Sequence, residues 1–461
     1  MPADLPPILI LMPDQQRWDA LGCAGTPAVR TPNMDRIARE GVRFSNAVSV
    51  SPLCMPARAA FVTGLYPHNF GMWTNSGELP ADDETLFQCL QRAGYRVAYV
   101  GKSHFYPHGD FHMREREDWM RRRGIDIVRE CTGPHATTRT RSFVTDRWEP
   151  RGLWQLFKDD YARRGKAGPV EALWPSPLPD DEHLDALIGE KALEVIEAYD
   201  EERPLCLFVG FGGPHEPWDA PARWAETYDP GDCVTGIPCE ALPATLPEHA
   251  RERLSRGRHE NIPEEAARKI HALYYAKVSH IDHWFGRIMD AFERRGWLQE
   301  ALIVHWTDHG EMLCDHGRFH KSVFYDGSVR IVMTVRWPGR IEAGQVCGAL
   351  VETIDVFPTI LEAVGAEHSG RCLGRSLWPC LRDPSAEIRE AAFSEVNDTT
   401  MVMTRRHKYA MDSQGRGYML YDLERDPREE HNLIGAARTG PLERRMREML
   451  LRFYASTQVR Q

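Results

Sequence analysis

A cysteine at position 54 begins a short motif that could hold an anion. Pro56 follows it by two residues and Arg58 by four, and an apolar stretch then ends in Thr63-Gly64. Proline is favoured in the first turn of a helix, so the spacing predicts a helix that begins near Cys54. The N-terminus of a helix carries partial positive charge, and Arg58 would lie one turn along it. A reactive group at position 54 would therefore face a region that attracts anionic substrates.

Two pairs of residues far apart in the sequence could bind one divalent cation. Asp14-Gln15 follows an apolar run near the start of the chain, and Asp308-His309 follows a later run. Two carboxylates, an amide oxygen and an imidazole favour Ca²⁺, Mg²⁺ or Mn²⁺. Each pair alone is as consistent with a cap or a turn. Their occurrence together with the Cys54 motif predicts a metal site.

Apolar segments that resemble buried strands precede the residues capable of chemistry. The predicted strands end in Asp14-Gln15, in a segment with Lys102 and His104, in a segment with His215, and in Asp308-His309; they span residues 8–12, 95–100, 205–211 and 302–306. Predicted helices at 33–40, 84–92, 186–199 and 264–295 alternate with them. The carboxyl ends of parallel strands meet at one edge of a sheet. The pattern predicts an α/β fold in which helices sandwich a large mixed, mostly parallel sheet with one active-site edge.

Two further segments depart from this alternation. Residues 111–179 are rich in arginine, tryptophan and proline and show no clear periodicity. They form either a solvated insertion or a lid that shapes the substrate pocket and receives an anion. Short strand-like pieces and a final amphipathic helix follow residue 384, which predicts a small antiparallel sheet with one helix. We therefore expect a catalytic domain at 1–375 and a small α+β subdomain at 376–461.

The composition excludes several classes of protein. The chain has 461 residues and a formal net charge of -10, which gives no support to nucleic-acid binding. No stretch is long and apolar enough to cross a membrane, and the first residues lack a basic leader with a cleavage site. The 11 cysteines form no CxxC pair, which argues against zinc ribbons and thioredoxin-like chemistry. We expect mostly buried, reduced thiols in a cytoplasmic protein.

The Cys54 motif resembles the signature of the type I sulfatases, which share the fold of the alkaline phosphatase superfamily. In that family the cysteine is oxidised to formylglycine, whose hydrated aldehyde is the nucleophile and a metal ligand. The resemblance implies that Cys54, Asp14, Gln15, Asp308 and His309 surround one divalent cation. It covers nearly the whole chain, from the first strand to the segment Tyr421-Asp422-Leu423.

The same resemblance implies roles for five further residues besides Arg58. Lys102 and His104, in Val100-Gly101-Lys102-Ser103-His104, match the second sulfatase signature. Lys102 would neutralise substrate oxygens, and His104 would take the proton that allows sulfate to be eliminated. His215 and Lys321 match the side of the site that stabilises or protonates the departing alkoxide. Asn75 would bind a substrate oxygen or cap a turn.

Some positions also resemble a related branch of the family. Gln15, Asn75 and His309 are similar to residues of the phosphonate monoester and phosphodiester hydrolases. Many sulfatases have an aspartate at the position of Gln15. A neutral amide in place of that carboxylate removes one negative ligand, which favours Mn²⁺ over Ca²⁺. By the same resemblance, that branch has tyrosine and threonine at the positions of Lys102 and His104. These two residues therefore depart from that branch, and their positive charge suits a sulfate ester.

We therefore expect a sulfatase that hydrolyses sulfate monoesters, arylsulfatase-like and promiscuous toward phosphate and phosphonate esters. The alternatives are a phosphonate monoester or phosphodiester hydrolase with the same nucleophile and a non-catalytic anion-binding relic. The expected partners are a small-molecule sulfate ester, a formylglycine-generating or equivalent maturation enzyme, and further copies of the chain in a homo-oligomer.

Overall fold

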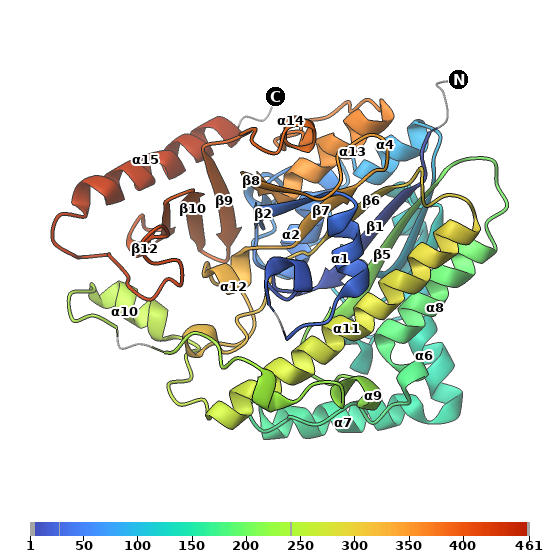
Figure 1. Ribbon diagram of the computed structural model, residues 1–461, viewed down its shortest axis with the longest axis horizontal. Helices are drawn as coiled ribbons and strands as arrows, with labels where there is room; N and C mark the ends of the chain where they lie inside the picture. The colour runs from blue at the N-terminus through green and yellow to red at the C-terminus, as the bar shows by residue number, and fades with distance from the viewer. Residues whose placement is uncertain (1–4, 27, 240–241, 459–461) are drawn as a thin grey trace.

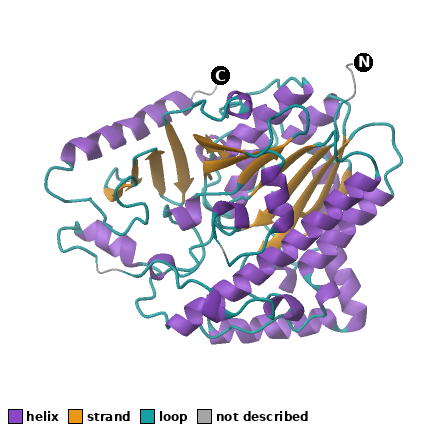
Figure 2. Cartoon of the chain, in the orientation of Figure 1, coloured by secondary structure: helices purple, strands orange, loops and turns teal. Residues whose placement is uncertain are grey.

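Two β-sheets organise the chain (Figures 1 and 2). The computed structural model describes residues 5–458 except residues 27 and 240–241. The larger sheet has eight strands in the order β4-β3-β5-β1-β6-β7-β2-β8. The smaller one has four strands in the order β12-β11-β10-β9.

The larger sheet is mixed and mostly parallel, as the sequence predicts. β1 pairs in parallel with β5 on one side and β6 on the other, and β7 is antiparallel to both of its neighbours. Its strands in chain order are β1 (Ile8–Asp14), β2 (Val42–Val48), β3 (Arg96–Lys102), β4 (Ile127–Cys131), β5 (Leu205–Pro214), β6 (Leu302–Trp306), β7 (Met333–Arg336) and β8 (Gln345–Glu352). The predicted fold class is confirmed.

Helices cover both faces of this sheet, which explains the continuous apolar run of β1. Leu9 and Leu11 point into the core beneath α1 (Pro32–Arg39), α8 (Leu184–Glu197) and α11 (Glu264–Arg294). The alternating residues, including Ile10, point into the opposite core beneath α2 (Cys54–Thr63), α4 (Leu86–Arg92) and α13 (Val356–Val364). A strand buried on both faces needs apolar residues at every position. The chemistry is therefore left to the strand ends.

The segment 111–179 is regularly folded, which differs from the expectation of a stretch without periodicity. β4 extends the sheet beside β3. The same segment contains three helices, one before β4 and two after it: α5 (Glu117–Arg122), α6 (Phe143–Trp148) and α7 (Leu153–Ala167). The apolar face of α7 consists of Trp154, Phe157 and Tyr161. Gln155 and the exposed Leu156 lie between Trp154 and Phe157, and three charged residues lie between Phe157 and Tyr161, which obscures the helical period.

The smaller sheet is antiparallel and packs beside the larger one. It comprises β9 (Ala391–Val396), β10 (Thr399–Thr404), β11 (His407–Asp412) and β12 (Gly417–Asp422), with α15 (Gly440–Thr457) against it. His68 of α3 (Pro67–Phe70) contacts Glu395 of β9 and Thr457 of α15, which ties the two parts together. We retain a domain boundary near residue 375 as a proposal; α14 (Trp378–Arg382), just after it, packs in the core of the larger sheet.

Among the helices that the structure describes, none is both long and apolar enough to cross a membrane.

Candidate active site

Cys54 is the first residue of α2, as its motif predicts. Leu53 before it is extended, and Pro56 lies in the first turn, where its missing N–H costs no hydrogen bond. The exposed Asn75 caps this turn, because its Oδ1 accepts a hydrogen bond of 3.0 Å from the Met55 backbone N–H. Every residue of α2 is buried, so the helix is held rigidly in the core. Position 54 is thus presented by a fixed helix N-terminus.

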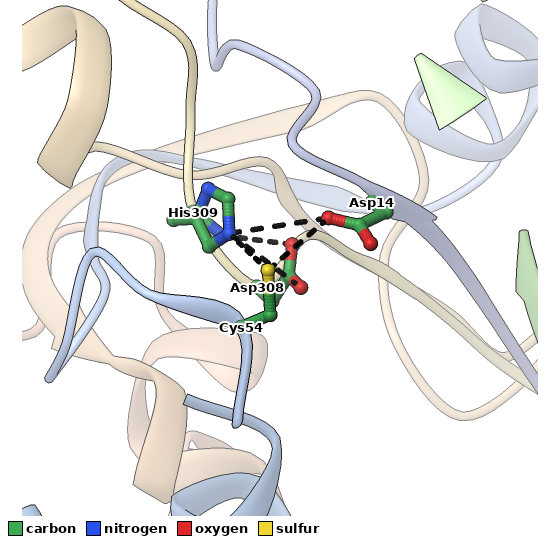
Figure 3. A group of neighbouring side chains, drawn as sticks. All are labelled: Asp14, Cys54, Asp308 and His309. Carbon is green, nitrogen blue, oxygen red and sulfur yellow. Dashed lines mark hydrogen bonds and ion pairs between the residues drawn. The ribbon is translucent and has the colours of Figure 1, made fainter. Parts of the chain in front are cut away.

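Strand pairing brings the predicted metal ligands to this N-terminus. β1 and β6 are adjacent and parallel, so Asp14 at the end of one lies beside Asp308 and His309 just after the other. Cys54 Sγ lies 3.1 Å from His309 Nε2 and 3.8 Å from Asp14 Oδ1 (Figure 3). Ligand atoms of these four buried residues all lie within 4.8 Å of one another. The four therefore converge on one point from three different segments.

Arg58 and Lys102 balance the two carboxylates. Arg58 Nε donates to Asp308 Oδ2 at 2.9 Å, and its Nη2 lies 3.2 Å from Asp14 Oδ2. The Lys102 ammonium forms an ion pair with the same oxygen of Asp14. Burial alone would raise the pKa of Asp14, but Lys102 and Arg58 lower it well below its usual range. Asp14 is thus kept ready to act as a negatively charged ligand, and Asp308 is held in place by Arg58.

The position between the carboxylates favours positive charge. Burial acts to lower the pKa of His309, but the Asp308 carboxylate and Cys54 raise it to about 9. Two carboxylates and an imidazole are a chemically suitable donor set for a divalent cation such as Ca²⁺ or Mn²⁺. The residues present therefore fit the metal that the sequence predicts.

Gln15 lies on the opposite side of the cluster, next to Lys321. Its backbone N–H donates to Asp308 Oδ1 at 3.0 Å. Its side-chain oxygen accepts a hydrogen bond from Lys321, and its Nε2 donates to Glu216 at 2.6 Å and also to Glu311. The structure thus engages the amide oxygen with Lys321, and a role of Gln15 as a metal ligand stays a prediction.

Lys321 and His215 form a hydrogen-bonded pair beside Gln15. Lys321 Nζ lies 2.7 Å from His215 Nε2, and His215 Nδ1 lies 2.7 Å from the Glu216 carbonyl oxygen. A carbonyl only accepts, so Nδ1 carries the proton and Nε2 accepts from Lys321. Burial lowers the pKa of His215 well below its usual value. Burial also acts to lower the pKa of Lys321, but the charges of Glu216 and Cys54 outweigh it and raise the pKa of that ammonium above its usual value. The pair is therefore a neutral imidazole next to a firmly protonated amine.

His104 lies on the Lys102 side of the site. Its ring stacks on His108 with centroids 4.7 Å apart, and its buried Nδ1 has no hydrogen-bond partner among the described residues. Burial, followed by the charges of His108 and Lys102, lowers the pKa of His104 well below its usual value. A neutral imidazole with an unpartnered nitrogen is suited to accept a proton.

A family model described as "Sulfatase" matches residues 6–366, which is more than three quarters of the chain. The chain belongs to the sulfatase family. A second model, described as "N-sulphoglucosamine sulphohydrolase, C-terminal", matches residues 314–456 of this sulfatase. The membership that the sequence motifs predict is confirmed.

Individual relatives resemble this sulfatase over most of their length. It is 27% identical over 453 residues to the arylsulfatase of Clostridium perfringens, covering 94% of this chain and 90% of the relative. It is 28% identical over 454 residues to the choline-sulfatase of Rhizobium meliloti, covering 95% and 84%. Among solved structures, the phosphonate monoester hydrolase of Agrobacterium radiobacter superimposes with a TM-score of 0.80 at 23% identity, covering 98% and 96%. The similarity to this solved structure shows a shared fold.

The structure of this sulfatase adds residues that the sequence analysis did not assign. Lys277 of α11 donates to the backbone oxygens of His215 and Pro217 at 2.8 and 2.9 Å and to Asp219 at 2.7 Å, which fixes the loop after β5. Glu216, which lies beside Gln15 and Lys321, was also not assigned. Its position next to His215 in the sequence is the signal that points to it. For Lys277 no local signal exists, because it lies within the predicted helix 264–295 and only the packing of α11 shows where it points.

His108 and His135 were also missed, and for different reasons. The sequence analysis assigned no role to His108, although it follows the same strand, β3, as His104. His135 follows β4, a strand that the sequence analysis did not predict, and its ring centroid lies 5.7 Å from that of His215. Both belong to loops at the carboxyl ends of strands, where parallel sheets gather functional residues.

Proposed function

We propose that this protein hydrolyses sulfate monoesters, with arylsulfatase-like selectivity, and releases inorganic sulfate and an alcohol. The observation that carries the proposal is the position of Cys54 at the N-terminus of α2, 3.1 Å from His309 and 3.8 Å from Asp14. A thiol buried among two carboxylates, an imidazole and two cations has no packing role that requires these neighbours. The site is suited to an anionic group beside a metal.

Asp14, Asp308 and His309 would hold one divalent cation, Ca²⁺ or Mn²⁺, with Gln15 as a further candidate ligand. When bound, the cation would supply charge that stabilises negative oxygens of the substrate. Formylglycine made from Cys54 would supply the nucleophile. Arg58 orients whatever oxygen stands at position 54, because its guanidinium is fixed between Asp14 and Asp308.

Five residues around the cluster would act on the substrate directly. Lys102 would hold non-reacting oxygens of the sulfate group, and Asn75, at the mouth of the site, could donate to another. Lys321 and His215 would face the leaving oxygen, where the protonated amine lowers the energy of the developing alkoxide. His104, with its free nitrogen, would accept the proton that permits release of sulfate.

The second candidate is a phosphonate monoester or phosphodiester hydrolase that uses the same residues. The observation in its favour is the set Gln15, Asn75 and His309, which the site gathers near position 54. Lys102 and His104 favour sulfate, because they add a cation and a base on the side where sulfate would be released. One preorganised cationic site can serve both classes, so we also propose side activities toward phosphate and phosphonate esters.

A comparison of two esters with the same leaving group tests this assignment. We expect a higher kcat/KM for 4-nitrophenyl sulfate than for 4-nitrophenyl phenylphosphonate, with protein produced together with a maturation enzyme. A higher value for the phosphonate would reassign the enzyme to the second class. The mass of the peptide that carries Cys54 tests the third alternative: an unmodified thiol and no turnover in the native host would indicate a non-catalytic anion-binding relic.

The cellular setting is also a proposal. None of the eleven cysteines is paired in a disulfide, which supports a reducing, cytoplasmic environment. In that compartment a formylglycine-generating or equivalent enzyme would act on Cys54. We further propose that the protein assembles as a homo-oligomer, which its hydrodynamic size would test.

A further inference from the structure

The tripeptide Gly-Pro-His occurs twice in the chain, each time at the carboxyl end of a strand of the larger sheet. Gly213-Pro214 closes β5 and His215 follows it, whereas Gly133-Pro134-His135 follows β4 after one intervening residue. β3 lies between these two strands and is parallel to both, so the two histidines approach the site from either side of Lys102 at the end of β3. A side chain at Gly133 would place its Cβ 2.9 Å from Lys102 Nζ, so the glycine lets this loop lie against the ammonium.

The loop that carries His135 is held in place by its own contacts. The backbone N–H and the hydroxyl of Thr137 both donate to the Gly133 carbonyl oxygen, at 3.1 and 3.0 Å. The His135 ring packs edge to face against the ring of Tyr161 on α7, with centroids 5.8 Å apart. The Tyr161 hydroxyl is itself fixed, because it donates to Asp219 at 2.8 Å. The imidazole is therefore positioned by the fold.

This position is on the side of the site that we assign to the leaving group. One ring nitrogen of His135, one of His215 and a carboxylate oxygen of Glu216 all lie within 4.8 Å of one another. His215 in turn contacts Lys321, with 2.7 Å between Nε2 and Nζ. His135 is exposed, and with Glu216 it lines a cavity of about 580 Å³ that could receive a small organic molecule.

Two histidines and a carboxylate at this spacing could suggest a second metal ion, but the hydrogen bonds argue against one. Both ring nitrogens of His215 are engaged, because Nδ1 donates to the Glu216 carbonyl oxygen and Nε2 accepts from Lys321. The Lys321 ammonium also lies 3.7 Å from a carboxylate oxygen of Glu216. A metal ion here would stand beside this ammonium, and the two positive charges would repel each other.

The nitrogens of His135, by contrast, are uncommitted. Among the described residues, its side chain makes ring contacts with Tyr161 and His215 and no hydrogen bond or ion pair. An imidazole carries at least one N–H in either protonation state. Lys321 already donates to Gln15 and His215, which leaves one of its three ammonium protons for a substrate oxygen. His135 therefore brings a second available donor to the leaving-group side.

We propose that His135 is a further catalytic residue, whose ring N–H donates a hydrogen bond to the oxygen of the departing alcohol beside Lys321. The bond between sulfur and this oxygen breaks with its electron pair on the oxygen, while the oxygen at position 54 forms the new bond to sulfur. The alcohol takes its proton from Lys321, and His135 stabilises the charge that develops before this transfer. The inference rests on the proposed function, which places the leaving group on this side.

Substitutions that remove or keep the donor test the proposal. His135→Phe removes the N–H and keeps an aromatic ring against Tyr161, so the fold should be retained. His135→Asn and His135→Gln each keep an amide N–H, at about the reach of Nδ1 and of Nε2. His283→Phe is the matched control, at a half-buried histidine of α11 whose ring contacts Trp224. The probes are 4-nitrophenyl, 4-chlorophenyl and phenyl sulfate, which release phenolates of increasing basicity.

A donor to the leaving oxygen matters most where that oxygen becomes most basic. His135→Phe should lower kcat/KM for phenyl sulfate by about tenfold or more and for 4-nitrophenyl sulfate by less than about threefold. At least one of the two amide variants should exceed His135→Phe by about threefold or more on phenyl sulfate. His283→Phe should change all three values by less than about twofold. Equal losses on the three esters, no loss, or no recovery with either amide would overturn the proposal.

A double variant distinguishes direct contact with the leaving oxygen from an effect through Lys321. In the Lys321→Ala background, His135→Phe should still lower kcat/KM for phenyl sulfate by about fivefold or more. No further loss would show that His135 only positions Lys321, and would overturn a direct role. A wild type that prefers phosphonates would refute the proposed function alone. The same variants on aryl phenylphosphonates, which release the same phenolates, would then decide the role of His135.

Discussion

Lys321 Nζ donates to His215 Nε2 over 2.7 Å, while His215 Nδ1 is bound to the Glu216 carbonyl oxygen. The imidazole is thus a fixed acceptor, and in the proposed mechanism the proton that faces the leaving oxygen is on Lys321. This division of roles was not evident from the sequence, which suggested either residue as the acid. The proposed mechanism therefore places the main charge for departure of the alcohol on the amine.

Lys321→Ala should therefore affect esters with poor leaving groups most. We expect kcat/KM to fall about 10²- to 10³-fold for phenyl sulfate and less for 4-nitrophenyl sulfate, whose phenolate needs little stabilisation. The measurement is a plot of log kcat/KM against leaving-group pKa for both proteins. An unchanged slope would show that Lys321 does not act on the leaving oxygen.

Cys54→Ala should abolish turnover and keep the fold. We expect kcat/KM for 4-nitrophenyl sulfate to fall at least about 10⁴-fold, because the nucleophile is lost. Thermal unfolding should show a melting temperature close to that of wild type. Cys372→Ala, at another free cysteine away from the cluster, is the matched control and should stay active. Activity of Cys54→Ala at the wild-type level would exclude the mechanism.

Lys102→Ala should damage sulfate turnover more than phosphonate turnover. Lys102 pairs with Asp14, so its loss also leaves a buried carboxylate less compensated and should lower stability. The ratio of kcat/KM for the two 4-nitrophenyl esters removes this common effect. We expect the ratio to shift toward the phosphonate by about tenfold or more. Equal losses on both esters would count against the assignment of Lys102.

Removal of the cation should inactivate the enzyme and destabilise it. Without a metal, Asp14 and Asp308 depend on Arg58, Lys102 and His309 alone for charge compensation. We expect chelator-treated protein to lose activity and to unfold at a lower temperature, and Ca²⁺ or Mn²⁺ to restore both. Elemental analysis should give one metal per chain, and Asp308→Asn should bind less. Full activity in metal-free protein would contradict the proposal.

Glu130 should impose a pH dependence on stability. Burial raises the pKa of this carboxyl to about 7, although Ser103 and Tyr106 donate hydrogen bonds to it. The folded protein then binds more protons than the unfolded chain between about pH 4.5 and 7, so the free energy of unfolding falls as pH rises through this window. The contribution is fully present at lower pH and amounts to roughly 3 kcal/mol.

Glu130→Gln isolates that contribution. The variant should gain stability relative to wild type by up to roughly 3 kcal/mol as pH rises from 5 to 8. The measurement is urea unfolding of both proteins at the two pH values. A difference between the proteins that does not change with pH would show that Glu130 titrates near its ordinary pKa.

The sequence by itself determined the fold class, the family and the chemical identity of the cluster. The apolar runs at β1, β3, β5 and β6, each followed at once by polar residues, imply a parallel sheet with one functional edge. The Cys54 motif acts through local geometry: Pro56 and Arg58 need only the turn of one helix to reach their positions. Such features depend on neighbours in the chain, and spacing therefore reveals them.

Only the tertiary structure decided which contacts each of these residues makes in the site. The amide of Gln15 turns toward Lys321, Asn75 caps α2, and Lys277 reaches the His215 loop from the middle of a helix. Trp218 and α7 enclose a cavity although 51 residues or more separate them in the chain. These relations arise from the order of the strands and the packing of helices across them. No periodicity or local spacing encodes a contact between segments that meet only after folding.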